Sequence, residues 1–399
     1  MTRRLYYEDS YLKDFDALVL ELATAGQPAV VLDQTAFYPN SGGQPHDVGT
    51  LGTARVLSVD EDPSGRILHN LDSELSHGRV AGHIDWQRRF DHMQQHSGQH
   101  ILSQAFLKVC GAQTISFHLG PETSTIDLDI PAPPLALMRE AEELATRIVF
   151  ENREVRVLKV ERDDLSALGV RKASDRTGPI RVIDVEGFDR SPCGGTHVRR
   201  AGEIGMIAIL GCERYKGGTR VEFVCGWRAF GSMRTDHETL RRLARVCTAH
   251  PLDLPELTEK LLQEKAALGK EVARLENQVL ELEAEELMNH ADKLGETLLV
   301  RRLFVGRRIE TIKVLAQKLA RRPGVIALLA ADDPSPQVIL ARSSNAPGDC
   351  NAAVREVVAR CGGRGGGRPE LAQAGGIPAE AVEKWLEEAE ACFRKAASL

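Results

Sequence analysis

Hydrophobic and polar positions alternate in short runs over residues 1 to about 90. The clearest run covers residues 29–33 and is followed by turn-forming residues from Tyr38 to Gln44. Glycines at positions 49, 52, 65 and 82 separate further short apolar segments. Short strands separated by turns are typical of a small barrel or meander. The pattern therefore predicts an N-terminal β-barrel over residues 1–90.

Residues 91–250 combine helical and strand-like periodicities. We expect a helix that begins near Asp91, with Asp91 as its N-cap and Gln94 at the N3 position. A second helix is expected at residues 136–152. Alternating or continuous apolar runs predict three strands, at residues 125–130, 181–185 and 221–224. This stretch is predicted to be an α+β domain.

A heptad pattern follows over residues 251–293, where a long amphipathic helix is expected. Its core positions are Leu254, Leu261, Leu268, Leu275 and Leu282, with Val272 and Val279 between them. Lys265 and Glu286 interrupt the seam. Two interpretations remain open: a coiled coil that dimerises, or a helix that packs on its own chain.

Residues 294–399 read as a compact α/β domain. Buried strands are expected at residues 325–330 and 337–341, followed by a glycine-rich loop at 362–369 and a polar terminal helix. The fold class is therefore α+β, in four parts: residues 1–90, 91–250, 251–293 and 294–399. A homodimer through the 255–293 helix or through the C-terminal domain is expected.

Charge is distributed unevenly along the chain. The 399 residues carry a net charge of -6. Residues 294–399 contain 16 Lys+Arg and 12 Asp+Glu, so this part is +4 and the remainder is -10. The asymmetry favours an anionic partner for the C-terminal part. No apolar stretch approaches the roughly 20 residues that span a bilayer, and the N-terminus lacks a signal-peptide core, so we expect a cytoplasmic protein without membrane contact.

The candidate chemistry lies in the second part. His96 and His100 are four residues apart, so they share one face of a helix. Cys193 and His197 flank two glycines and a threonine, and the glycines permit a tight turn. Three nitrogen ligands and one sulfur ligand suit tetrahedral Zn²⁺. Ser97 stands where a zinc protease would carry a glutamate, which argues against that class.

These motifs resemble the editing domain of alanyl-tRNA synthetase and its free-standing relatives, the AlaX proteins. Residues 32–38, 42–49 and 202–205 are also similar to that family. Residues 365–376 are similar to the C-terminal domain of alanyl-tRNA synthetase, which is also found attached to DHH-type phosphoesterases. The resemblance runs through nearly the whole chain and identifies it as a long-form AlaX protein.

The resemblance implies a zinc-dependent hydrolase that deacylates mischarged tRNA(Ala), with seryl and sometimes glycyl esters as substrates. Zinc would be held by His96, His100, Cys193 and His197. A synthetase needs several hundred residues before its editing domain, whereas about 90 precede His96 here and the chain starts with Met. We therefore expect no aminoacylation activity.

Discrimination of serine from alanine needs a group that bonds the serine hydroxyl. The candidates are Thr114 and Ser116, on the strand expected after the first metal-ligating pair, and Ser116 best matches the family position that senses this hydroxyl. The alternative is an ordinary strand serine. Gln44 is a second candidate for the pocket wall.

The glycine-rich segment is the candidate RNA contact. Arg364 and Arg368 flank Gly365, Gly366 and Gly367, which suggests phosphate binding by guanidinium and backbone N–H groups. The alternative is a flexible connection.

Two other functions remain open: a non-catalytic tRNA-binding module with a structural zinc, and a relative of the DHH-type phosphoesterases. The second is weaker, because Asp91 and His92 only superficially resemble the motif of that class.

Overall fold

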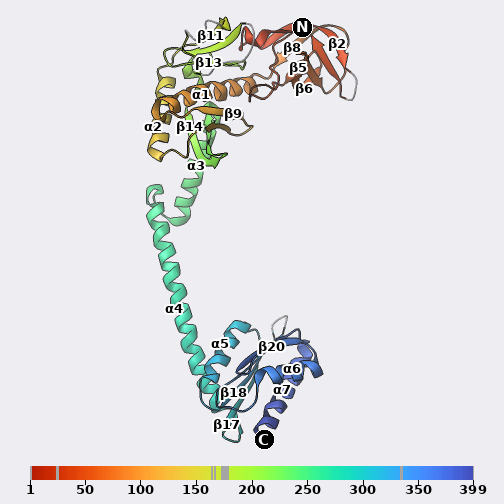
Figure 1. Ribbon diagram of the computed structural model, residues 1–399, viewed down its shortest axis with the longest axis vertical. Helices are drawn as coiled ribbons and strands as arrows, with labels where there is room; N and C mark the ends of the chain where they lie inside the picture. Colours follow the sequence, from red (N-terminus) through yellow and green to blue (C-terminus); the bar gives the residue numbers. More distant parts are fainter. Residues whose placement is uncertain are drawn as a thin grey trace. The chain divides into compact units, whose positions relative to one another are not determined.

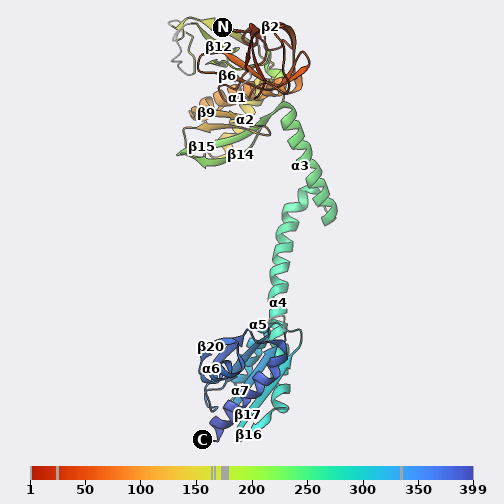
Figure 2. The ribbon, with the colours of Figure 1, turned by 90° about the vertical axis from the view of Figure 1, so that its right-hand side faces the viewer.

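The computed structural model describes residues 2–23, 27–162, 165, 168–171, 179–332 and 336–398. The chain forms two compact units, Met1–Pro251 and Leu252–Leu399 (Figures 1 and 2). Among the described residues, no helix combines the length and the apolar character that crossing a membrane requires.

A closed barrel of six strands begins the first unit, with the order β2-β3-β7-β6-β5-β8. Its strands are β2 (Asp14–Ala23), β3 (Ala29–Leu32), β5 (Gly49–Leu51), β6 (Ala54–Glu61), β7 (Ile67–Leu71) and β8 (Gly78–Ile84). Apolar side chains such as Phe15, Leu32 and Ile67 alternate with polar ones along the strands and fill the interior. The predicted N-terminal barrel is confirmed. The short strands β1 (Arg3–Arg4) and β4 (Gln34–Thr35) pair in parallel beside it.

The rest of the first unit is built around the long helix α1 (Trp86–Cys110). A four-stranded sheet, a three-stranded sheet and helix α2 (Leu135–Phe150) surround it. The four-stranded sheet has the order β14 (Ile207–Tyr215), β15 (Gly218–Cys225), β10 (Ser124–Leu128), β9 (Thr114–Leu119). The three-stranded sheet has the order β11 (Val155–Val160), β12 (Ile180–Val185), β13 (Asp189–Pro192). The α+β prediction for this part of the chain is confirmed.

Helix α1 begins five residues earlier than the sequence pattern predicts. Its N-cap is Asp85, whose side chain accepts a hydrogen bond from the Arg88 backbone N–H at 3.1 Å. Asp91, the predicted cap, instead pairs with Arg228. The prediction was wrong because apolar Trp86 and Phe90 already belong to the helix.

A buried ion pair joins α1 to the barrel side of the unit. The Arg89 side chain is fully buried and its Nε donates to Asp47 Oδ1 at 3.0 Å. Its Nη2 donates to the Ala36 carbonyl at 2.6 Å and its Nη1 to the Ser10 carbonyl at 2.9 Å. Because all three nitrogens are satisfied, the charge is tolerated in the interior.

Two long helices follow, α3 (Gly226–Cys247) in the first unit and α4 (Leu254–Asn289) in the second. The heptad leucines of α4 after Leu254 are exposed: Leu268 keeps 65% of its surface and Leu282 keeps 68%. Only Leu254, Leu280 and Ala284 of this helix are buried by the described residues. The seam therefore does not pack on the described part of its own chain, and dimerisation stays a prediction.

The second unit contains a six-stranded sheet between helices. The strand order is β16 (Asp292–Leu294), β17 (Thr297–Phe304), β18 (Val325–Ala331), β19 (Gln337–Arg342), β21 (Leu371–Gly375), β20 (Arg364–Arg368). Helix α5 (Ile309–Ala320) and the end of α4 pack on one face. Helices α6 (Cys350–Cys361) and α7 (Val382–Ala397) cover the other, so β18 is buried along its whole length (Figure 1).

The glycine-rich segment predicted as a loop is an edge strand, β20, paired antiparallel with β21. Glycine is required there by close packing: a Cβ on Gly367 would lie 2.3 Å from the Leu371 carbonyl oxygen. The terminal helix α7, predicted to be polar, is amphipathic and buries Trp385 and Phe393.

Candidate metal centre

Four side chains converge beside α1. His96 and His100 come from consecutive turns of the helix, and Cys193 and His197 come from the turn after β13. Their ligand atoms all lie within 4.8 Å of one another. Cys193 Sγ is 3.3 Å from His96 Nε2 and 3.3 Å from His197 Nε2. The two 3.3 Å distances match the ligand–ligand edges of about 3.3–3.6 Å that a tetrahedral zinc site needs.

The turn that carries Cys193 needs glycine for steric reasons. A Cβ on Gly195 would lie 2.2 Å from His96 Cε1, so only glycine lets this backbone pass so close to the imidazole. The Gly195 N–H donates to Cys193 Sγ at 3.3 Å. Gly195 therefore lets the turn that carries the sulfur approach the helix face.

Gln44 fixes the orientation of His96. Its Oε1 lies 2.8 Å from His96 Nδ1 and also accepts the Thr196 N–H at 3.2 Å, while its Nε2 donates to Thr196 Oγ1 at 2.9 Å. Since the carboxamide oxygen can only accept, His96 carries its proton on Nδ1. Its Nε2 is then free to bind an ion.

The other two histidines have polar neighbours at Nδ1. Ser97 Oγ lies 3.1 Å from His197 Nδ1. Asp189 Oδ2 lies 3.3 Å from His100 Nδ1, but this contact does not have hydrogen-bond geometry, and His100 Nδ1 has no hydrogen-bond partner among the described residues. Each imidazole thus has a polar neighbour at Nδ1. Such partners are characteristic of histidines that ligate metal.

Three of the four donors have pKa values shifted in the direction that metal binding requires. Burial lowers the pKa of His96 to about 3 and the pKa of His197 well below its ordinary value. Burial alone would raise the pKa of Cys193, but hydrogen bonding and charge from His100, the Gly195 amide and the charge of Arg181 lower it overall. The neutral imidazoles of His96 and His197 and an acidified thiol suit a metal ion.

Arg181 of β12 adds an unusual cation next to these donors. Its Nη1 donates to the carbonyl oxygens of Cys193 and Gly195, both at 2.8 Å. Its Nε and Nη2 are buried and have no hydrogen-bond partner among the described residues. Burial lowers the pKa of Arg181, and the opposing charges of Cys193, Tyr7 and Tyr38 only partly offset this effect. Two strong donors are therefore available beside the centre.

The structure separates the predicted pocket residues. Ile115 has no partner in the β9–β10 pairing, and this bulge puts Thr114 and Phe117 on the face toward α1. The Phe117 ring packs 5.2 Å from the His96 ring, and Thr114 Oγ1 donates to Ser103 Oγ of α1 at 2.7 Å. Ser116 lies on the opposite face, where its hydroxyl donates to Asp127.

The sequence pattern identified the four candidate ligands and Gln44 but missed Ser97, Asp189 and Arg181. Asp189 lies four residues before Cys193, yet nothing in the local pattern indicates that it faces His100. Arg181 begins an apolar strand, and its burial beside the donors depends on the tertiary fold.

Comparison with known proteins relates both units to one group of enzymes. Residues 180–222 match the family described as "Threonyl and Alanyl tRNA synthetase second additional domain", and residues 296–395 match the DHHA1 domain. The first match includes Cys193 and His197.

The relatives that align with nearly the whole chain are alanine–tRNA ligases. The enzyme of Pyrococcus furiosus is 33% identical over 388 residues, which is 93% of this chain and 42% of the ligase. The enzyme of Methanoculleus marisnigri is 34% identical over 404 residues, 97% of this chain and 43% of the ligase. The chain thus spans less than half the length of these relatives. Among solved structures, the C-Ala domain of the Aquifex aeolicus alanyl-tRNA synthetase matches 27% of this chain and 98% of its own, with 23% identity and a TM-score of 0.24.

Proposed function

This chain is a homologue of the alanine–tRNA ligases over 93% of its length, and it matches the second additional domain of the threonyl- and alanyl-tRNA synthetases and the DHHA1 domain. We therefore propose that it is an AlaX-type editing hydrolase. Its substrates are seryl-tRNA(Ala) and glycyl-tRNA(Ala), and it cleaves the ester that joins the amino acid to the terminal ribose. The observation that carries the proposal is the cluster of His96, His100, Cys193 and His197.

The donor set fits Zn²⁺ in number, chemistry and spacing. When bound, the ion would supply Lewis-acid polarisation or orientation of the ester. Gln44 fixes His96 in the ligating tautomer, and Ser97 and Asp189 lie beside Nδ1 of the other two histidines, so their part in the reaction is positioning.

Arg181 supplies the charge stabilisation expected of ester hydrolysis. Negative charge develops on the carbonyl oxygen as water adds to the ester, and fixed N–H donors in a water-poor site stabilise that charge. The buried Nε and Nη2 of Arg181 lack partners among the described residues and lie next to the Cys193–Gly195 turn. We assign Arg181 to this role.

Recognition of the serine hydroxyl requires a polar group on the α1 side of β9. Thr114 lies on that side, whereas Ser116 faces Asp127. We therefore favour Thr114 over Ser116, with Gln44 restricted to holding His96. Rejection of alanine would follow because its methyl group leaves the hydroxyl-binding group unpaired.

The test is to incubate the protein with seryl-, glycyl- and alanyl-tRNA(Ala) and to follow release of labelled amino acid. We expect rapid loss of serine and retention of alanine. Cys193→Ala should bind less than one equivalent of zinc and release serine slowly. If the zinc-loaded protein binds tRNA without releasing serine, it is a non-catalytic tRNA-binding module instead.

A further inference from the structure

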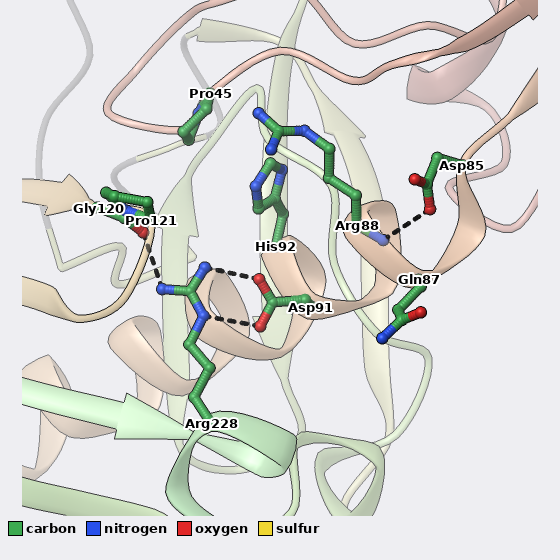
Figure 3. A pocket seen from close by; sticks show the side chains of 9 residues that line it. All are labelled: Pro45, Asp85, Gln87, Arg88, Asp91, His92, Gly120, Pro121 and Arg228. Carbon is green, nitrogen blue, oxygen red and sulfur yellow. Dashed lines mark hydrogen bonds and ion pairs between the residues drawn. The ribbon is translucent and has the colours of Figure 1, made fainter. Parts of the chain in front are cut away.

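Two adjoining cavities lie where the start of α3 meets the start of α1, outside the metal centre. The first has a volume of about 520 Å³ and is lined by Arg88, His92 and Arg228 among others (Figure 3). The second has a volume of about 690 Å³ and is lined by Trp86, Phe90 and Trp227 among others. Asp91 and Arg228 line both, so the cavities form one continuous polar and aromatic surface.

The first cavity presents unused hydrogen-bond donors. Arg88 Nε donates to the His46 carbonyl at 3.0 Å, which leaves its two terminal amino groups without a partner among the described residues. The His92 side chain is 3% exposed, and its Nδ1 has no hydrogen-bond partner in the described part of the chain. Figure 3 shows the Arg88 guanidinium next to the His92 ring. A free guanidinium and an unpartnered imidazole suit an anionic oxygen, such as that of a phosphate.

Arg228 makes this surface rigid in the absence of a ligand. Its Nε and Nη2 donate to Asp91 Oδ1 at 2.8 Å and Oδ2 at 2.6 Å, and its Nη1 donates to the Gly120 carbonyl at 2.8 Å (Figure 3). The two-pronged pair locks the first turn of α3 against α1. A preformed site loses little entropy when a ligand binds.

The second cavity presents aromatic rings to solvent. Trp227 keeps 72% of its surface exposed, so its ring is open to solvent. Trp86 and Phe90 are half-buried beside it, with ring centroids 5.5 Å apart. Exposed rings next to free cationic groups are the combination that binds single-stranded nucleic acid, because bases stack while phosphates pair.

The first cavity is also a neighbour of the metal centre. His92 precedes His96 by four residues, so the two side chains are about 6 Å apart along the helix axis. Pro45 lines the cavity and directly follows Gln44, which holds His96. A strand that occupies the cavities therefore ends close to the four donors.

We propose that these cavities bind the single-stranded 3′ end of tRNA, with a backbone phosphate at Arg88 and His92 and a base stacked on Trp227. The assignment rests on the proposed function, since it supplies the path by which the ester reaches the metal centre. It adds a substrate-binding site on α1 and α3 that is distinct from the edge strand of the second unit.

The test measures binding of a short unacylated RNA ending in CCA to the full chain, by fluorescence anisotropy of the labelled RNA. Trp227→Ala should weaken binding by about 5- to 100-fold through loss of one stacked base, whereas Trp227→Phe should retain most of the affinity. Arg88→Gln should weaken binding and reduce the slope of log K against log salt by about 0.7, the value for one phosphate contact to a single strand. Trp227→Ala should leave that slope unchanged.

Matched controls are Arg234→Gln, which removes an exposed charge from the same helix α3, and Phe150→Ala, which removes an exposed ring from α2. If Arg88→Gln and Trp227→Ala bind like these controls, the proposal is overturned. Because the RNA carries no ester, the result is independent of hydrolysis. If the protein does not deacylate seryl-tRNA(Ala) but still binds the RNA, and the variants still weaken that binding, then the proposed function is wrong and the proposed binding site stands.

Discussion

Gln44 and Asp189 meet the Nδ1 atoms of His96 and His100 without belonging to the donor set. We predict that Gln44→Ala or Asp189→Asn lowers zinc affinity by about 10- to 100-fold, because the imidazoles lose their fixed orientation. Competition against a chromophoric chelator measures this. Gln113→Ala, an exposed position, serves as control. Unchanged affinity in both variants would show that the histidines are held by packing alone.

The buried His69 inside the barrel should make the free energy of unfolding depend on pH. Burial lowers its pKa to about 4, and its ring lies 2.8 Å from Thr35 Oγ1 and 3.2 Å from the Val30 carbonyl. The unfolded chain binds a proton near pH 6.5 and the folded barrel does so only near pH 4. The stabilisation is therefore complete above about pH 6.5 and is lost as the pH falls.

Between pH 7 and pH 5, His69 should account for a decrease of about 2 kcal/mol in the free energy of unfolding. Urea unfolding at both pH values measures it. His69→Gln should reduce the pH dependence by that amount, and His118→Gln, at an exposed position, should not. An equal pH dependence in His69→Gln and in the unmodified chain would contradict the assignment.

How far single residues could be anticipated depends on whether their partners are local. His96 with His100 and Cys193 with His197 are each four apart, so local geometry was enough to pair them. Gln44 was predicted as part of the pocket wall, but its contact with His96 was not predicted. That contact spans 52 residues of sequence and depends on how the barrel packs on α1. The role of Ser116 in sensing the serine hydroxyl stays a prediction. The bulge at Ile115 puts Ser116 on the face of β9 opposite Thr114, and strand alternation alone does not reveal a bulge.

Among the elements, β20 makes a specific prediction about RNA. Arg364 and Arg368 lie at its two ends on an exposed edge of the sheet and share one face of the strand. Replacing both with alanine should weaken tRNA binding. It should also lower the slope of log K for tRNA binding against log salt by about 0.9 for each duplex phosphate that is no longer neutralised. Zinc content should stay constant. Arg394→Ala on α7 is the control. An unchanged slope in the variant that lacks Arg364 and Arg368 would mean that β20 contributes to packing and not to RNA binding.

Helix α4 predicts the oligomeric state. Its exposed seam contains Leu268, Val272 and Leu275, which match the heptad pattern and have no covering element among the described residues. We expect a dimer in solution and a monomer for the double substitution Leu268→Lys and Leu275→Lys, by sedimentation equilibrium. The exposed substitution Lys270→Glu, off the seam, should leave the dimer intact. A monomeric unmodified chain would refute the coiled coil.

The periodicity of hydrophobic positions predicts some of these elements correctly. The barrel and the heptad helix have strong, sustained patterns, and the structure contains both. The glycine-rich strand β20 was mistaken for a loop because its three central residues are glycines, which cannot display an alternating pattern. Its pairing is dictated by β21, which the local sequence does not encode.

For the whole molecule, the division at Pro251 separates a unit with the metal-ligating cluster from one that contains the basic stretch 294–399. We predict that a chain ending at Pro251 retains zinc and hydrolyses seryl-tRNA(Ala) with a raised KM and a similar kcat, because the second unit binds the substrate and the transition state equally. Steady-state kinetics on the two chains test this. An unchanged KM would mean that the second unit does not contribute to tRNA affinity.

The buried pair of Arg89 with Asp47 has a thermodynamic consequence for the first unit. Asp47 lies three residues after Gln44, so one loop of the barrel side contacts both the interior of α1 and a metal-ligating histidine. Ion binding at the histidines therefore favours the docked loop, and a docked loop favours ion binding, by mutual linkage. Chelation should then lower the melting temperature of the barrel as well as that of the surrounding sheets, in one concerted transition.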